Sequence, residues 1–257
     1  MRALRQMHRC VPPSGAHAPV MIREPFIFRE TFATILADAP EHVAAAKKGM
    51  MEARQHIEAY IFRDPFFRDT FDPYTPVSDD PVICRMATAA RNAGTGPMAA
   101  VAGAIANEGV AAMVDAGAQF GVIDNGGDIA LVSNRNVRIG IHAGTAPLSD
   151  KIAFVVPPHD TILGICTSSA TVGPSISFGV ADAVSVFGTN PFIADAWATA
   201  ICNQIRADDK SILDRLPDTG VTGVLAILGD TMITWGNLPP IVPAVVDEHL
   251  ISAGDRL

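Results

Sequence analysis

The sequence lacks paired cysteines and an excess of positive charge. Its four cysteines, Cys10, Cys84, Cys166 and Cys202, lie far apart and form no Cys-x-x-Cys pair, so they are most simply buried or free thiols in a reducing compartment. The 19 lysines and arginines stand against 27 aspartates and glutamates, which gives a net charge of −8. This charge argues against nucleic acid or an anionic membrane as a main partner, because both attract basic surfaces. Phosphate binding by such a chain needs help from a metal.

Long apolar runs are missing as well. The most apolar stretch, Met98 to Ala106, is mostly Ala and Gly and is followed by Asn107 and Glu108, so it is too short to span a bilayer. We expect it to form a buried helix that approaches neighbouring backbone closely. Residues 1–20 lack the apolar core of a secretory signal. The expectation is a poorly ordered extension at 1–20, a single domain over 21–257, and a cytoplasmic protein.

Several common active-site signatures do not occur. The chain has no G-x-S-x-G, no Walker loop, no G-x-G-x-x-G and no histidine pair at metal-ligand spacing. His142 and His159 end or follow predicted strands, and the sequence shows no partner for either. Most histidines are therefore expected at the surface.

Capping residues and apolar periodicity predict four helices. Asp38 to Glu41 reads as a capping box, and Asp80 before Pro81 and Asn190 before Pro191 read as N-caps. Residues 65–76 are rich in proline and predict a surface connection. The first predicted helix starts at the capping box and ends before Asp64. The other three span 81–93, 97–117 and 191–206.

The rest of the chain is typical of antiparallel strands. A hairpin is expected at 22–36, and period-two patterns follow at 121–132, 137–142, 152–156, 161–167, 181–187 and 221–235. The helix at 97–117 leads into a hairpin turned at 126–128, and the helix at 191–206 leads into one turned at 229–230. These two helix-hairpin units predict an α+β fold with a duplicated helix-plus-antiparallel-sheet architecture. A doubly wound parallel fold needs strands and helices to alternate, and here they do not.

The segment Asn125-Gly126-Gly127-Asp128 separates two apolar runs and allows two interpretations. It fits a plain hairpin turn, in which glycine supplies positive φ. It also fits a binding turn in which paired glycines let a ligand touch the backbone while Asn125 and Asp128 make polar contacts.

A second candidate, Thr167-Ser168-Ser169, ends an apolar strand and leads into further hydroxyl residues. One interpretation is an ordinary Ser/Thr turn. The other is a loop that holds phosphate or sugar oxygens through hydroxyl and amide donors, without positive charge.

Asp195 and Thr199 form the third candidate. They are four residues apart in Ala194-Asp-Ala-Trp-Ala-Thr-Ala200 and share a helix face, while Ile193, Trp197 and Ile201 form the apolar ridge on another face. A carboxylate and a hydroxyl between alanines suit a hard cation such as Mg²⁺. The alternative is a solvated helix face on which Thr199 bonds back to a carbonyl one turn earlier.

Taken in order, these segments resemble motifs of the ApbE superfamily of flavin transferases. The resemblance covers roughly residues 95–235 and includes Gly103-Ala-Ile-Ala-Asn-Glu-Gly109. Four motifs in the same order are more specific than any one of them. The earlier segments Arg54–Ile61 and Gly96–Gly103 look similar to an ApbE-like branch without a lipoprotein signal.

The resemblance implies a T-fold-like core that binds FAD and Mg²⁺, cleaves the pyrophosphate and transfers FMN to a threonine of an acceptor protein. Asp195 and Thr199 match the metal-binding pair of the family, and the carbonyl near Ala106 matches a third ligand. The flavin or nucleotide site would then include Asn107, Asn125–Asp128 and Thr167–Ser169.

Two departures from the family pattern favour an alternative function. Asn107 stands where the family has a lysine, and Gly173–Phe178 occupies the place of its His-x-x-Asp-Pro segment, so no general base is evident. The alternative is an accessory protein of redox or sulfur metabolism that binds a flavin or nucleotide without transferring it. The sequence does not determine the oligomeric state, and a homo-oligomer is one of the alternatives.

Overall fold

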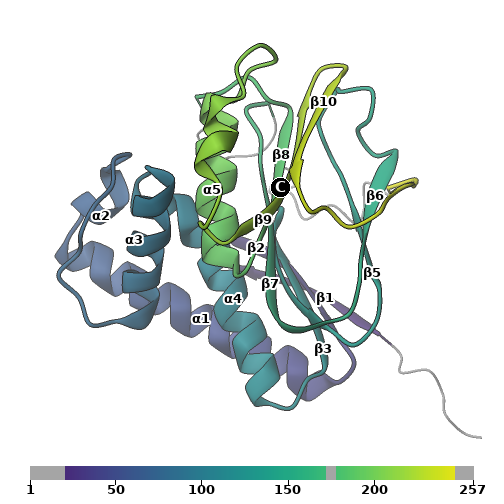
Figure 1. The fold of residues 1–257 in the computed structure, drawn as a ribbon. Coiled ribbons are helices and arrows are strands. Elements are labelled where there is room, and N and C mark those ends of the chain that lie inside the picture. The colour runs from purple at the N-terminus through teal and green to yellow at the C-terminus, as the bar shows by residue number, and fades with distance from the viewer. Residues whose placement is uncertain (1–20, 172–177, 247–257) are drawn as a thin grey trace, which may run out of the picture.

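The computed structural model describes residues 21–171 and 178–246. The extension expected at residues 1–20 and the segment 173–177 lie outside this range. An eight-stranded antiparallel sheet has helices on one face and a three-stranded sheet on the other (Figure 1). The helices are α1 Pro40–Arg63, α2 Phe66–Asp69, α3 Pro81–Ala93, α4 Val101–Asp115 and α5 Pro191–Gln204, with 3-10 turns η1 Pro97–Ala100 and η2 Ser211–Arg215.

The strands of the large sheet follow the order β1-β2-β3-β4-β7-β8-β9-β10, and those of the small sheet follow β11-β6-β5. Every neighbouring pair is antiparallel. The bounds are β1 Ile22–Phe28, β2 Thr31–Ala37, β3 Phe120–Asn125, β4 Asp128–Ser133, β5 Val137–Gly140, β6 Ile152–Val156, β7 His159–Ser168, β8 Ala183–Gly188, β9 Val221–Leu228, β10 Thr231–Gly236 and β11 Ile241–Pro243.

The large sheet consists of two four-stranded halves with the same order of elements. In each half two strands precede the helices and two follow them: β1 and β2 come before α1 to α4, and β7 and β8 come before α5. The two predicted helix-hairpin units are α4 with β3 and β4, and α5 with β9 and β10. The α+β class with antiparallel strands is confirmed, whereas the T-fold assignment stays a prediction.

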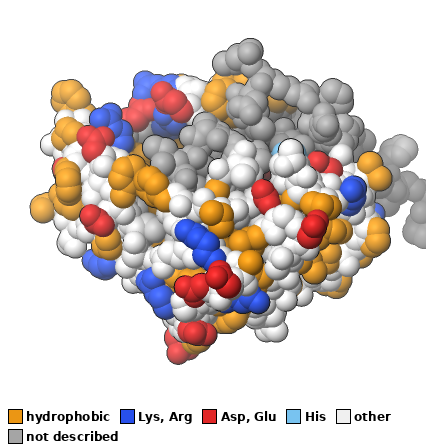
Figure 2. Space-filling model, turned by 90° about the horizontal axis from the view of Figure 1, so that it is seen from above, with side chains coloured by type: hydrophobic (Ala, Val, Ile, Leu, Met, Phe, Trp, Pro, Cys, Tyr) orange, Lys and Arg blue, Asp and Glu red, His pale blue; other side chains and the backbone are white. Residues whose placement is uncertain are grey.

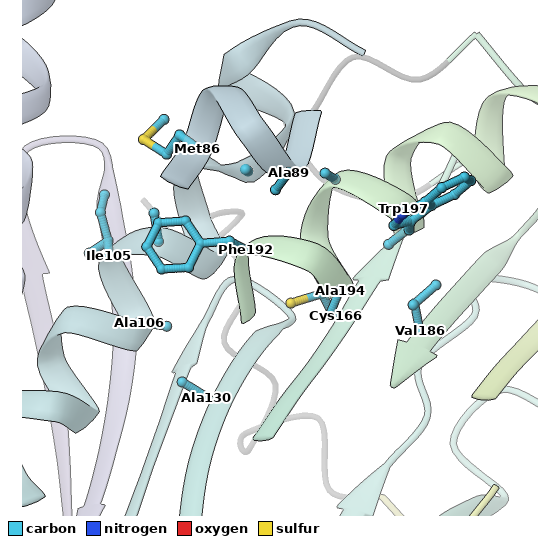
Figure 3. Close-up of a cluster of buried hydrophobic side chains, with 14 of the residues drawn as sticks. Met86, Ala89, Ile105, Ala106, Ala130, Cys166, Val186, Phe192, Ala194 and Trp197 are labelled. Atoms are coloured by element: carbon cyan, nitrogen blue, oxygen red, sulfur yellow. The ribbon is translucent and has the colours of Figure 1, made fainter. Parts of the chain in front are cut away.

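Alternating side chains of the large sheet enter two separate cores. On β4, Ala130 and Val132 join the core under the helices, while Ile129 and Leu131 join the core under the small sheet. The helix-side core contains the ring of Phe192 and the indole of Trp197 (Figure 3). Because the sheet is covered on both faces, its end near the β3–β4 turn is where a cavity can reach both sides.

The Ala/Gly helix lies at the centre of the helical layer, where α4 contacts α1, α5, β3 and β4. Among the described residues one stretch, Pro97–Asp115, is long and apolar enough to cross a bilayer by length and composition, and 56% of its most apolar window is buried in the protein. The expected buried helix is therefore confirmed, although its first turn, η1, is a 3-10 helix. Its glycines allow the close packing, since a Cβ on Gly109 would meet Met50 and Ile123.

Two predicted N-caps are confirmed, and the predicted capping box is wrong, although its helix begins there at Pro40. The Asp80 side chain accepts hydrogen bonds from the amides of Val82 and Ile83, and the Asn190 side chain accepts one from Ile193. The capping box before α1 does not form, because its N-cap is Ala39, which makes no side-chain cap bond. Asp38 instead pairs with both terminal nitrogens of Arg135, at 2.6 and 3.0 Å. A bidentate charged pair outcompetes a single amide for that carboxylate.

Some elements escaped the sequence reasoning. The short helix α2 interrupts the predicted connection at 65–76, and β11 was not expected. The strand predicted at 137–142 ends at Gly140. Period-two patterning identified β5 and β6 correctly but not their placement in a second sheet, because alternation shows that a strand has a buried face and not which sheet it joins.

Replacing Gly103 with valine is expected to destabilise the protein by about 1–3 kcal/mol. A Cβ at this position of α4 would lie 2.5 Å from the Pro191 carbonyl oxygen and 2.9 Å from the Asp195 Cβ, both on α5. Urea unfolding followed by circular dichroism measures the change. Val114→Ala on the same helix, at a side chain 41% exposed, is the control and should change stability by less than about 0.5 kcal/mol. Equal stability of Gly103→Val and the native protein would refute the tight α4–α5 contact.

Candidate functional site

A cavity of about 1340 Å³ opens at the end of the large sheet where the β3–β4 turn lies. Its volume exceeds the range of roughly 300–1,000 Å³ of ordinary small-molecule sites, so it has room for a dinucleotide. Its walls come from the β1–β2 hairpin, the second half of α1, the start of α4, the β3–β4 turn, the end of β7, one face of α5, and β5 in the small sheet.

This cavity brings together most of the residues singled out from the sequence. Those that line it are Asn125, Gly126, Gly127, Asp128, Thr167, Ser168, Ser169, Asp195 and Thr199. The three candidate segments therefore share one cleft, as one site requires.

Ala106 and Asn107 are not among the lining residues. Ala106 is fully buried in the apolar cluster between α4 and β4, close to Ala130 (Figure 3). Asn107 is 3% exposed and donates a hydrogen bond to the Glu108 side chain. The α4 backbone that does line the cleft is one turn earlier, at Ala102, whose carbonyl accepts a hydrogen bond from Asn125 Nδ2 at 3.0 Å.

Asp195 is held by the first turn of α4. Its Oδ2 accepts a hydrogen bond from the Gly103 amide at 2.8 Å, and the Ala102 amide also lowers its pKa. α4 has no side-chain cap of its own, so a carboxylate from α5 caps it. The side chain is buried, which excludes the solvated-face interpretation for Asp195. Burial raises the pKa of Asp195 to about 7 despite these amides.

Asp128 faces Asp195 from the first residue of β4. Burial, and then the negative charge of Asp195, raises the pKa of Asp128 well above its usual range, while a hydrogen bond with Cys166 acts in the opposite direction. Burial and the same two carboxylates raise the pKa of the Cys166 thiol. When both carboxylates are ionised they repel each other, and a cation held between them would relieve that repulsion.

The β3–β4 turn is both a hairpin turn and a wall of the cleft. Gly126 and Gly127 have φ angles of 68° and 101°, which L side chains rarely adopt. Asp124 Oδ1 accepts the Gly127 amide at 2.8 Å, and the Gly127 carbonyl accepts the Thr167 amide at 3.1 Å. The two interpretations of this segment are therefore compatible, because the turn that joins the strands also contributes backbone to the cleft.

Thr167, near the end of β7, lies on the opposite side of the sheet from the carboxylates, whereas Ser168 alternates to the side of Asp128. Thr167 Oγ1 is 2.8 Å from Ser185 Oγ, and the Ser169 hydroxyl accepts the Thr171 amide at 3.0 Å. Thr167 shares its face of β7 with Ile165, which belongs to the core under the small sheet. The cleft consequently passes around the sheet end, with the carboxylates on one side and the hydroxyls of Thr167 and Ser185 on the other.

The donors at the carboxylate corner fit a hard cation. Asp128, Asp195 and the Thr199 hydroxyl supply oxygen atoms, the ligands that Mg²⁺ prefers. No group of three or more His, Cys, Asp or Glu side chains suited to a metal occurs within residues 21–171 and 178–246. A bound cation would thus depend on the hydroxyl, backbone carbonyls, water or ligand phosphate for its remaining positions.

The sequence reasoning missed a charged group at the far end of the cleft. Arg54 interrupts the apolar stripe of α1, and its side chain pairs with Glu30 and Glu58 and donates to Thr31 Oγ1 at 3.0 Å. Burial, and then the charge of Arg29, lowers the pKa of Arg54. The sequence signal for this charged group was the polar Arg54 within the otherwise apolar stripe of α1. On the face seen in Figure 2, described basic and acidic side chains lie next to one another.

Solved flavin transferases share this fold. The apo form of the Pseudomonas stutzeri flavinyl transferase ApbE aligns over 84% of this chain and 94% of its own, with a TM-score of 0.52 and 13% identity. The flavin transferase ApbE from Vibrio cholerae aligns over 84% and 96%, with a TM-score of 0.52 and 12% identity. At such identities the likeness establishes the fold alone. The fold class is that of the ApbE flavin transferases.

The sequence itself gives the family. A family model described as AbpE bacteria matches residues 28–253, and the chain belongs to this family. The UPF0280 protein of Methanoregula boonei is 65% identical over 238 residues, which cover 92% of this chain and 100% of the relative. The UPF0280 protein of Methanoculleus marisnigri is 64% identical over 234 residues, covering 91% and 96%. The resemblance to the ApbE superfamily is thereby confirmed.

Neutralising one carboxylate of the pair should stabilise the protein when no metal is present. The pKa of Asp128 is higher in the folded than in the unfolded chain, so its ionised form disfavours folding, increasingly so as the pH rises above about 4. In EDTA at pH 8, Asp128→Asn should unfold at a higher Tm than the native protein, and the gain should shrink toward pH 4, where the native carboxylate is protonated.

Differential scanning calorimetry measures this effect. Asp160→Asn, on the exposed part of β7, is the control and should leave Tm nearly unchanged at every pH. A lower Tm for Asp128→Asn than for the native protein at pH 8 would show that its carboxylate is already compensated.

Proposed function

We propose that this protein is a Mg²⁺-dependent flavin transferase that binds FAD in the cleft, cleaves its pyrophosphate and passes FMN to a threonine hydroxyl of an acceptor protein. The observation that carries the proposal is the carboxylate pair of the partly buried Asp128 and the buried Asp195, with Thr199, at one corner of a cavity large enough for a dinucleotide. The family and the fold support flavin as the ligand.

Asp128, Asp195 and Thr199 would hold the cation. When bound, Mg²⁺ neutralises charge on the pyrophosphate and on the departing AMP. The protein has a net charge of −8, so the carboxylate corner by itself repels a polyphosphate. A cation is therefore a condition for binding as well as for catalysis.

The remaining walls of the cleft bind and orient the flavin nucleotide. The backbone at Gly126 and Gly127 carries no side chain, so the ligand can touch the turn directly. The Ser168 and Ser169 residues bring hydroxyl groups to the same wall, and hydroxyls hold phosphate or sugar oxygens without adding charge. Enclosure by the sheet end and α1 limits the access of water.

The reaction exchanges the phosphoanhydride bond of FAD for a phosphate ester bond to the acceptor threonine. The threonine oxygen of the acceptor forms a bond to the FMN phosphorus, and the bond between that phosphorus and the AMP oxygen breaks. The hydroxyl proton passes to a base, and AMP leaves. With water in place of the acceptor, the same chemistry releases FMN and AMP, which makes AMP a measurable product before an acceptor protein is known.

Incubation with FAD and Mg²⁺ tests the proposal. We expect AMP release above a control without protein, and none in EDTA. Thr199→Val removes one oxygen donor but keeps the shape and leaves the Asp195 cap intact, so it should lower the rate about 100-fold, equivalent to ~2.7 kcal/mol. Asp195→Ala should abolish release, and Asp160→Asn should retain it. Chromatography of nucleotide products gives the measurement.

Binding measurements separate this function from that of an accessory protein. Thermal shifts with FAD, FMN and ADP, with and without Mg²⁺, report ligand binding independently of turnover. Stabilisation by a flavin without AMP release would support the non-transferring alternative. No AMP and no stabilisation by any of these ligands would refute a flavin or nucleotide function for the cleft.

A further inference from the structure

A histidine from the small-sheet side of the cleft has an acidic partner that the sequence did not reveal. His142 lines the cavity, and its Nδ1 lies 3.1 and 3.2 Å from the two carboxylate oxygens of Asp150. Ser149 Oγ donates to Asp150 Oδ2 at 3.0 Å and accepts the Ala143 amide at 2.9 Å. The expectation that His142 has no partner is therefore wrong, since the β5–β6 loop folds back on itself.

The backbone holds Asp150 in a conformation that few residues adopt. Its φ is 62°, in the left-handed region. The Asp150 amide donates to the Ile141 carbonyl at 2.9 Å, and its carbonyl accepts the Val246 amide at 3.0 Å. Such a conformation persists where surrounding bonds fix it, and it places the carboxylate under the imidazole.

The hydrogen bond to Asp150 determines which ring nitrogen of neutral His142 carries the proton. An ionised carboxylate only accepts, so the proton of neutral His142 lies on Nδ1. Nε2 then carries the free lone pair. Of the histidines in residues 21–171 and 178–246, His142 alone lines the cavity.

His142 lies on the same side of the large sheet as Thr167, and both line the cleft. Ile141 and Ile165 belong to the same buried cluster between the two sheets. Thr167 is two residues beyond Ile165 on the same face of β7, and His142 follows Ile141. The imidazole and the Thr167 hydroxyl thus line the cavity on the side of the large sheet that faces the small sheet, whereas Asp195 lines it on the helix side.

We propose that His142 is the general base of the transfer reaction, and that Asp150 is the positioning residue that sets its tautomer. This inference rests on the proposed flavin transfer. The acceptor hydroxyl gives its proton to Nε2 as its oxygen bonds to the FMN phosphorus, and the AMP oxygen leaves with the electron pair of the broken bond. Asp150 stabilises the imidazolium that results.

Substitutions at the dyad test the role of the imidazole. His142→Gln should lower the turnover number for AMP release about 100-fold or more, while the KM for FAD changes less than about threefold. Added imidazole should restore activity to His142→Ala, which a structural role would not allow. His159→Gln is the control, because His159 lies at the start of β7 and is not among the cavity-lining residues; it should retain full activity.

Asp150→Asn isolates the positioning role. Asparagine tolerates the left-handed backbone as well as aspartate does, so the fold should persist, as circular dichroism can verify. The ¹⁵N shifts of the His142 ring should show Nδ1 protonated in the native protein and a mixture of tautomers in Asp150→Asn. Unchanged ring shifts would refute the positioning role.

A chemical footprint gives a measurement that does not depend on turnover. FAD with Mg²⁺ should protect His142, but not His159, from diethylpyrocarbonate, as read by mass spectrometry. If native protein releases AMP and His142→Gln is equally active, only this inference fails. If native protein releases no AMP, the proposed function fails and the catalytic role of His142 fails with it. Full modification of His142 under saturating FAD would also overturn the inference.

Discussion

The carboxylate of Asp195 against the N-terminus of α4 is the interaction on which the site depends. The first amides of a helix lack partners within it, and α4 has no side-chain cap. Asp195 supplies the missing acceptor from α5, and the two helices touch because Gly103 has no Cβ. This contact fixes α5 against α4 and turns the Asp195–Thr199 face toward the sheet end. Trp197, on another face of α5, is meanwhile buried in the helix-side core.

The cleft follows from the way the sheet end is covered. Side chains of β4 and β7 alternate between the helix-side core and the core under the small sheet, so the two faces carry different chemistry. Asp128 lies with Asp195 on one side, and Thr167 and Ser185 lie with the small sheet on the other. A ligand that reaches around the β3–β4 turn contacts both. This geometry separates the carboxylate corner of the cleft from the side that carries Thr167 and His142.

The carboxylate pair shows a conflict between stability and function. Burial and the charge of Asp195 make ionisation of Asp128 costly, whereas the α4 amides partly offset the cost of burying Asp195. Such a cost is typical of sites that gain their compensation from a bound ion. The Arg54 group at the other end of the cleft differs, because its charges are already paired with Glu30 and Glu58.

The sequence by itself determined the element types and the antiparallel α+β class. It also determined the caps at Asp80 and Asn190 and the motifs that meet in the cleft. These features follow from the sequence because local periodicity and capping chemistry act within a few residues. It did not reveal that Asp195 caps α4, that Asp38 leaves its helix for Arg135, or that Asp150 orients His142. It also pointed to Ala106, where the folded chain presents Ala102 to the cleft. Only the tertiary structure decided these, because a carboxylate bonds to whichever donor the packed chain brings nearest, and sequence spacing does not encode that distance.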